Sequence, residues 1–87
     1  YHGVSHELRN GKYFYHVRIH IKGNYSVGYY SSEEEAAIAY NKAIDILKRN
    51  GVTKNFTPNY IPDISPSRYA QIYTNIQISP KITAYRP

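Results

Sequence analysis

The chain has 87 residues, which is enough for one small domain with a thin core. It contains no cysteine, so disulfides and thiolate zinc sites, including the usual zinc fingers, are excluded. With 11 Lys and Arg against 6 Asp and Glu the net charge is +5, which suits a polyanionic partner such as nucleic acid or an anionic membrane surface.

The stretch from Lys12 to Lys22 gives the clearest structural signal. Apolar and aromatic residues alternate strictly with polar ones, which is the pattern of a half-buried antiparallel strand. One parity holds Tyr13, Tyr15, Val17, Ile19 and Ile21, and the other holds Lys12, Phe14, His16, Arg18, His20 and Lys22. We therefore expect the first set to face the core and the second set to face solvent.

Turn signals flank this strand on both sides. Asn10-Gly11 precedes it, the dipeptide best suited to a tight hairpin, and Lys22-Gly23-Asn24 follows it. A third strand is expected at about Tyr25–Tyr30, with Asn24 and Ser26 outward. Gly3-Val4-Ser5 provides the first strand, so residues 1–30 predict a three-stranded antiparallel meander.

Residues 32–50 predict an amphipathic helix. Ser32 and Glu35 have the spacing of a capping box, and the acids at 33–35 suit the positive end of the helix dipole better than a metal site. Gly51 is a suitable C-terminal stop. The apolar stripe consists of Ala36, Ala39, Tyr40, Ala43, Ile44 and Leu47.

After Phe56 the chain holds all five prolines and no glycine. Ser65-Pro66 is a good helix start, and an apolar face follows it, so a short helix is expected near 66–76, docked on the domain. The alternative is a disordered linker. The predicted fold class is α+β: a three-stranded antiparallel sheet packed against one amphipathic helix within residues 1–56, followed by an irregular Pro-rich extension over 57–87.

Catalytic and metal-binding interpretations find little support. His16 and His20 would lie about 13 Å apart along a strand, too far to share a metal whose ligands stand about 2 Å away. No spacing suggests a catalytic triad, and there is no phosphate-binding glycine loop and no carboxylate pair outside the helix cap. We therefore expect no enzyme activity, no metal and no cofactor.

The outward parity of the predicted sheet is more informative. It combines cations with neutral hydrogen-bonding groups and almost no carboxylate, whereas an ordinary solvated face, which is the alternative, usually mixes both signs. Arginine can bind guanine through two hydrogen bonds, asparagine can pair with adenine, and lysine can neutralise phosphate. The pattern favours binding to nucleic acid.

Several motifs together resemble the Apetala-two / ethylene-response-factor (ERF) DNA-binding domain. They are YHGV at 1–4, GKY at 11–13, VRI at 17–19, GYYSSEEEAAIAYNKA at 28–43 and NF at 55–56, and they span about two thirds of the chain. The resemblance implies a three-stranded sheet that enters the major groove of DNA while one helix supports it from behind.

Site residues follow from this resemblance position by position. Arg18 matches a contact arginine, and His16 matches a contact position that an acid usually holds in plant members. Asn24 and Ser26 match third-strand contact positions, His2 matches a first-strand arginine, and Ser5 falls where many members have another arginine. The loop from Ser5 to Gly11 is one residue longer than the common plant form. These departures favour a divergent branch: the apicomplexan transcription factors, which the tyrosine excess also favours, or the modules of phage and bacterial HNH endonucleases.

The sequence therefore predicts the DNA-binding domain of a transcription factor, located in the nucleus, or in the cytoplasm or nucleoid of a prokaryotic or phage source. The partner is double-stranded DNA, bound by a monomer, and no apolar run approaches the roughly 20 residues of a membrane span. The expected DNA-binding residues are Arg18, His16, Asn24, Ser26, His20, Lys12, Phe14, Lys22, Arg9, His2 and Ser5. The alternatives are the targeting module of an HNH-type homing endonuclease and a protein–protein interaction module that docks through its tyrosines and Pro-rich extension.

Overall fold

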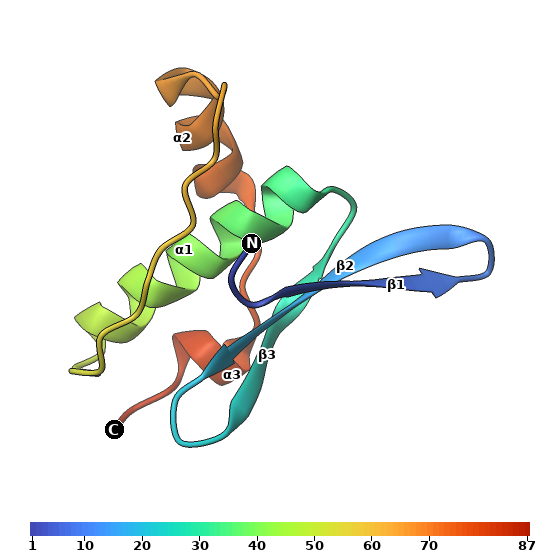
Figure 1. Ribbon diagram of the computed structural model, residues 1–87. Coiled ribbons are helices and arrows are strands. Elements are labelled where there is room, and N and C mark those ends of the chain that lie inside the picture. Colours follow the sequence, from blue (N-terminus) through green and yellow to red (C-terminus); the bar gives the residue numbers. More distant parts are fainter.

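The computed structural model describes residues 1–87, with a sheet followed by helices (Figure 1). The three strands form one antiparallel sheet in the order β1-β2-β3, and they span Val4–Arg9 (β1), Lys12–His20 (β2) and Asn24–Tyr30 (β3). The helices span Glu33–Arg49 (α1), Pro66–Asn75 (α2) and Pro80–Thr83 (α3). The predicted fold class, a three-stranded antiparallel sheet with a following helix, is confirmed.

The first hairpin is longer than the sequence indicated. Strand β1 runs to Arg9, so the segment that we expected to be a loop from Ser5 onward is mostly strand. Only Asn10 and Gly11 remain as the turn, and both have positive φ angles, 50° and 78°, as a two-residue hairpin turn requires. The strand was missed because its inward positions include the polar residue His6, which weakens the alternation.

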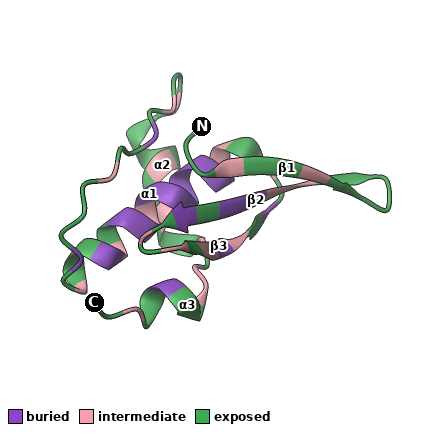
Figure 2. Cartoon of the chain, turned by 60° about the horizontal axis from the view of Figure 1, so that its bottom comes forward, coloured by how far each residue is buried: buried purple, intermediate pink, exposed green.

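The inner face of the sheet packs on α1 as expected. Val17, Ile19 and Val27 are at most 1% exposed and form one core cluster with the alanine-rich stripe of the helix. The outer end of the β1–β2 hairpin extends beyond this cover (Figures 1 and 2). Tyr13 is therefore 60% exposed, so the expectation that it faces a core is wrong.

A β-bulge in β3 changes which side chains face outward. Between Val17 and Arg18 the register shifts, so that Val27 and Gly28 together stand opposite Val17. Uninterrupted alternation would point Tyr29 into the core, but the bulge turns it outward and turns Tyr30 inward, where it is 8% exposed. A Cβ at Gly28 would lie 2.6 Å from the Tyr30 hydroxyl, so the bulge requires glycine at this position.

Helix α1 begins at the predicted cap. The Ser32 hydroxyl accepts a hydrogen bond from the Glu35 amide at 3.1 Å. The Glu35 carboxylate does not complete the box on the Ser32 amide, because it accepts instead from the Ser31 hydroxyl at 3.4 Å. None of the helices combines the length and apolar character that crossing a bilayer would require.

The helix expected near 66–76 is present as α2, with Ser65 as its N-cap. It lies against α1, where the Tyr73 hydroxyl donates to the Asp45 carboxylate at 2.7 Å and the Lys42 ammonium donates to the Tyr73 carbonyl at 2.7 Å. Burial and the Asp45 hydrogen bond raise the pKa of Tyr73 to about 12. These polar contacts fix α2 although none of its residues is fully buried.

Helix α3 was not predicted, and it completes the core. Ile82 is 0% exposed and belongs to the same cluster as Val27. The preceding segment is attached to β3, because the Ser79 amide donates to the Val27 carbonyl at 2.9 Å and the Tyr30 hydroxyl donates to the Gln77 carbonyl at 2.6 Å. It begins with the same Ser-Pro signal as α2, but a helix of four residues is too short to show the apolar face by which α2 was predicted.

Candidate nucleic-acid interface

The sheet face opposite α1 is built from cross-strand pairs, whose side chains lie on the same side of the sheet. Strands β1 and β2 contribute Ser5 with His16, Glu7 with Phe14, and Arg9 with Lys12; strands β2 and β3 contribute His16 with Tyr29, Arg18 with Ser26, and His20 with Asn24. We call this set the polar face. Ten of the eleven residues that the sequence nominated lie on this face or, like His2, line its edge. The exception is Lys22, which stands in the turn before β3.

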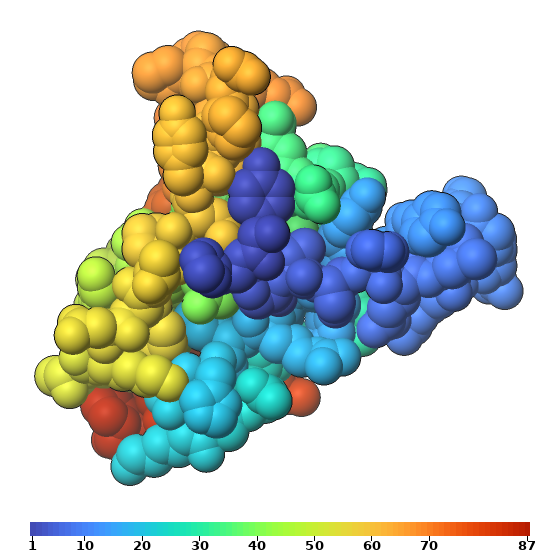
Figure 3. Space-filling model, viewed as in Figure 1, coloured from blue at the N-terminus to red at the C-terminus, as the bar shows by residue number.

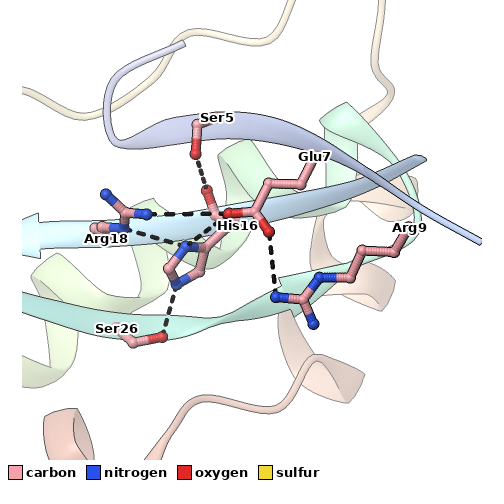
Figure 4. Close-up of polar contacts among 6 residues, drawn as sticks. All are labelled: Ser5, Glu7, Arg9, His16, Arg18 and Ser26. Atoms are coloured by element: carbon pink, nitrogen blue, oxygen red, sulfur yellow. Dashed lines mark hydrogen bonds and ion pairs between the residues drawn. The ribbon is translucent and has the colours of Figure 1, made fainter. Parts of the chain in front are cut away.

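His16 is the centre of the polar face, and it is buried. Its ring stacks on Tyr29 with the centroids 4.2 Å apart and the planes 4° from parallel. Its Nε2 lies 2.9 Å from the Ser26 hydroxyl, and its Nδ1 accepts a hydrogen bond from Arg18 Nε at 3.1 Å (Figure 4). Only 6% of the residue is exposed, so the expectation that His16 projects into solvent is wrong. The cause is the bulge in β3, which brings Tyr29 over the imidazole.

The hydrogen bonds define the protonation state of His16. An arginine Nε–H can only donate, so His16 Nδ1 must be the unprotonated nitrogen and Nε2 carries the hydrogen that the Ser26 hydroxyl accepts. Burial lowers the pKa of His16 below its ordinary value of 6.5, and Arg18 and Arg9 lower it further, while Glu7 acts in the opposite direction. His16 is thus a neutral imidazole at pH 7.

Glu7 is the one carboxylate of the polar face, and the sequence placed it in a loop. Its Oε2 lies 3.3 Å from Arg9 Nη2, and its Oε1 lies 4.0 Å from Arg18 Nη2 and 3.8 Å from His16 Nδ1 (Figure 4). Two arginines therefore share the charge of this acid. The side chains of Arg9 and Arg18 remain more than half exposed, so both are accessible to a ligand.

Tyr29 is a second residue of the polar face that sequence reasoning missed. One side of its ring covers His16, and Arg9 lies over the ring with its guanidinium carbon 5.2 Å from the centroid. Tyr29 is 48% exposed. Its signal was present in the Gly28-Tyr29-Tyr30 motif, since a glycine inside a strand often marks a bulge.

Several nominated residues gather where β2 and β3 meet the N-terminal segment. His2, Ser5, Arg18, His20 and Asn24 line one shallow hollow together with Tyr40 of α1. Across the hairpin, His20 Nδ1 lies 3.3 Å from Asn24 Oδ1. The hollow contains no carboxylate.

Two residues after α1 support this end of the sheet, and the sequence did not single them out. Lys54 donates its ammonium hydrogen to the His20 carbonyl at 2.9 Å, which adds a cation beside the hollow. The buried Asn59 side chain accepts from the His2 amide at 2.6 Å and donates to the His2 carbonyl at 3.1 Å. The segment that follows α1 therefore holds the N-terminal residues in place.

The remaining cations stand at the two ends of β2. Lys12 is exposed on the hairpin, which protrudes from the body as an arm (Figure 3), and Lys22 is exposed in the turn before β3. From Lys12 to His20 the strand is about 26 Å long at the usual rise per residue. Positive charge thus extends over about three quarters of one turn of duplex DNA, which is about 34 Å long.

No group of three or more metal-ligating side chains comes together in the chain. Comparisons of the chain with protein families, curated proteins and solved structures found no match. Function is therefore inferred from the polar face itself.

Proposed function

We propose that the chain binds double-stranded DNA sequence-specifically through the polar face, as the DNA-binding domain of a transcription factor that acts in the nucleus. The observation that carries the proposal is the arrangement of Arg18 on β2: its side chain is 53% exposed, and its Nε donates to His16 Nδ1 two residues away on the same face of the strand. A fixed arginine on a sheet surface is suited to the guanine edge in the major groove.

The shape of the sheet supports this mode of binding. The major groove is about 12 Å wide and admits a two-stranded β-ribbon. The β1–β2 hairpin is such a ribbon, and no helix covers its outer half (Figure 1). Helix α1 packs on the opposite face of the sheet, so a duplex can approach the polar face without meeting it.

The side chains divide into two roles under this proposal. Arg18 binds a guanine and Asn24 binds an adenine, because both are exposed on the polar face and carry the hydrogen-bonding groups that match these bases. Lys12, Lys22 and Lys54 bind phosphates, since flexible ammonium groups at the ends of the sheet meet the backbone rather than the bases. One chain binds one site, without cofactor or catalysis.

The resemblance of residues 28–43 to the ERF domain supports the same mode of binding. It also leaves a rival of the same class, in which this domain directs an HNH-type endonuclease to its site. The two share one interface and differ in what the full-length protein carries. A nuclease segment in the full-length gene would favour the endonuclease.

A specific observation favours one rival of a different class. Leu8 and Tyr13 are directly opposite each other on the reverse side of the hairpin and are 61% and 60% exposed. Uncovered apolar side chains of this kind often contact another protein. Under this rival the hairpin arm binds a protein and the polar face is only its solvated side.

Residues on opposite sides of the β1–β2 hairpin give a matched test. We expect fluorescence anisotropy on a labelled duplex to give a log–log salt slope of about −3, as phosphate contacts by three lysines require. Lys12→Gln on the polar face should weaken binding and flatten the slope by about one unit. Leu8→Gln on the reverse side should leave both unchanged. A slope near zero would overturn the proposal in favour of the protein-interaction rival, and a loss of duplex binding in Leu8→Gln alone would overturn the assignment of the interface to the polar face.

A further inference from the structure

We propose that His16 is a positioning residue for base recognition: its neutral imidazole, beside Arg18 on the same strand, holds Arg18 Nε and leaves the two terminal nitrogens of Arg18 to bind the base. The inference rests on the proposed binding of DNA and names how the polar face obtains its specificity. It also replaces the expectation that His16 reads a base itself, since a side chain covered by Tyr29 does not reach a ligand.

The contacts of Arg18 within the protein leave its two terminal nitrogens able to donate to a guanine. Nε is engaged by His16 Nδ1 at 3.1 Å, and Nη2 is 4.0 Å from Glu7 Oε1, which is an ion pair rather than a short hydrogen bond. Both terminal nitrogens therefore retain donors for guanine O6 and N7. A long arginine side chain otherwise loses rotamer freedom when it binds, and a guanidinium that is already held loses less.

The imidazole is itself held from several directions, so it provides a rigid support. Strand β3 contributes the Ser26 hydroxyl at 2.9 Å from Nε2 and the Tyr29 ring stacked at 4.2 Å. Strand β1 holds only the backbone of the same residue, since the Ser5 hydroxyl donates to the His16 carbonyl at 3.5 Å. The imidazole that accepts from Arg18 is thus held by contacts from β3.

This arrangement makes recognition sensitive to pH. The charged and titratable groups that face His16 are Glu7 and Arg9 from β1, Arg18 from β2 and Tyr29 from β3. A protonated imidazole has no acceptor for Arg18 Nε and carries a like charge beside it, while Glu7 at 3.8 Å attracts the new charge. Discrimination between bases should therefore fall on acidification below pH 6.5, since the pKa of His16 is lowered from that value.

The sign of this effect separates it from ordinary histidine behaviour. Histidines beside phosphates gain protons on binding, so their contribution raises affinity for every duplex as the pH falls. Release of Arg18 instead lowers the affinity for the preferred duplex relative to others. The measured quantity is accordingly the ratio of two dissociation constants, for the best site and for the same site with one guanine replaced.

Two amide substitutions at His16 distinguish the contribution of Nδ1, which contacts Arg18, from that of Nε2, which contacts Ser26. In His16→Asn the side-chain oxygen can occupy the place of Nδ1 and accept from Arg18, whereas in His16→Gln the amide reaches the place of Nε2 and contacts Ser26 only. We expect His16→Asn to retain the discrimination ratio and to make it independent of pH. His16→Gln should lower the ratio roughly three- to tenfold, the value of one hydrogen bond. In an Arg18→Ala background the two variants should discriminate equally, because the residue acts through Arg18.

Nitrogen-15 NMR of the imidazole tests the inference without DNA. The free protein should show the tautomer with hydrogen on Nε2, and a protonated Nδ1 at pH 7.5 would overturn the inference. Equal discrimination by His16→Asn and His16→Gln in proteins of equal melting temperature would overturn it as well. If the unmodified protein binds no duplex at all, the proposed function itself fails. If it binds and the two variants discriminate equally, only the positioning role fails.

Discussion

Replacement of Ile82 tests whether the C-terminal segment belongs to the folded domain. Ile82 is the buried residue of α3, 0% exposed, and it packs in the same cluster as Val27 and Leu47. Ile82→Ala removes three carbon atoms, about 0.8 kcal/mol each in transfer free energy, and the cavity left behind brings such substitutions to about 2–5 kcal/mol. One kcal/mol shifts the melting temperature of a domain this small by about 4–8 °C. A loss near 3 kcal/mol therefore lowers the melting temperature by about 12–24 °C.

Thermal unfolding followed by circular dichroism measures this shift. The control is Lys81→Ala, the exposed neighbour on the same helix, which should change the stability by less than about 0.5 kcal/mol. DNA binding measured well below both transitions should be unchanged in Ile82→Ala, because the residue lies in the core behind the sheet. A melting temperature within about 3 °C of the parent would refute the packing of α3 and the reasoning built on it.

Two further predictions concern the polar face and its pH dependence. Arg18→Ala should cost about 1–3 kcal/mol on the best duplex and relax preference at one base position, measured by binding to a set of single-base variants. Val17→Ala, adjacent but 0% exposed, should instead lower the melting temperature, and an Arg18→Ala protein that binds every duplex like the parent would contradict the assignment. Because burial lowers the pKa of His16 in the folded state from 6.5, the unfolded chain binds more protons, so the free energy of unfolding should decrease as the pH falls from about 6.5 towards the folded-state pKa. Urea unfolding at pH 7.5 and 5.5 should show this decrease, and His16→Asn should remove it.

The parts of the fold that the sequence predicted are those with local, repeated signals. Alternation over Lys12–Lys22 identified β2, and Asn10-Gly11 identified the turn because its two residues accept positive φ angles. The helix was evident from Ser32, the acids of its first turn and the apolar stripe. Each of these signals depends on the backbone conformation of a few consecutive residues, so no knowledge of distant contacts was needed.

The composition of the polar face was less predictable, because it depends on register. One extra residue in β3 reverses the direction of Tyr29, and the covered His16 follows from that reversal. Glu7 joined the site only because β1 extends to Arg9, which brings its carboxylate across from the β2 residues. Pairing between strands is a property of two segments together, and neither segment reveals it alone.

Long-range polar contacts were also beyond the sequence. Asn59 lies in a segment without helix or strand, yet its side chain bonds to the backbone of His2, and its own amide donates to Asn41 Oδ1 on α1 at 2.6 Å. The side chain and the backbone amide of Asn59 both have hydrogen-bond partners, so the residue can be buried, at 7% exposure, without an unpaired polar group. An asparagine in a Pro-rich stretch otherwise indicates only a loop.

The position of Glu7 makes the centre of the polar face suited to base contacts and its ends suited to phosphate contacts. A phosphate placed near Arg18 would meet the Glu7 carboxylate, which lies 4.0 Å from Arg18 and 3.3 Å from Arg9. No carboxylate stands beside Lys12 or Lys54 within ion-pair distance, so a phosphate is better accommodated at those ends. A base edge carries no net charge and is not repelled by the acid, while it still accepts hydrogen bonds from the guanidinium. The one carboxylate of a basic surface therefore disfavours backbone contacts where Arg18 stands and leaves base contacts available, which is the distribution that sequence-specific binding requires.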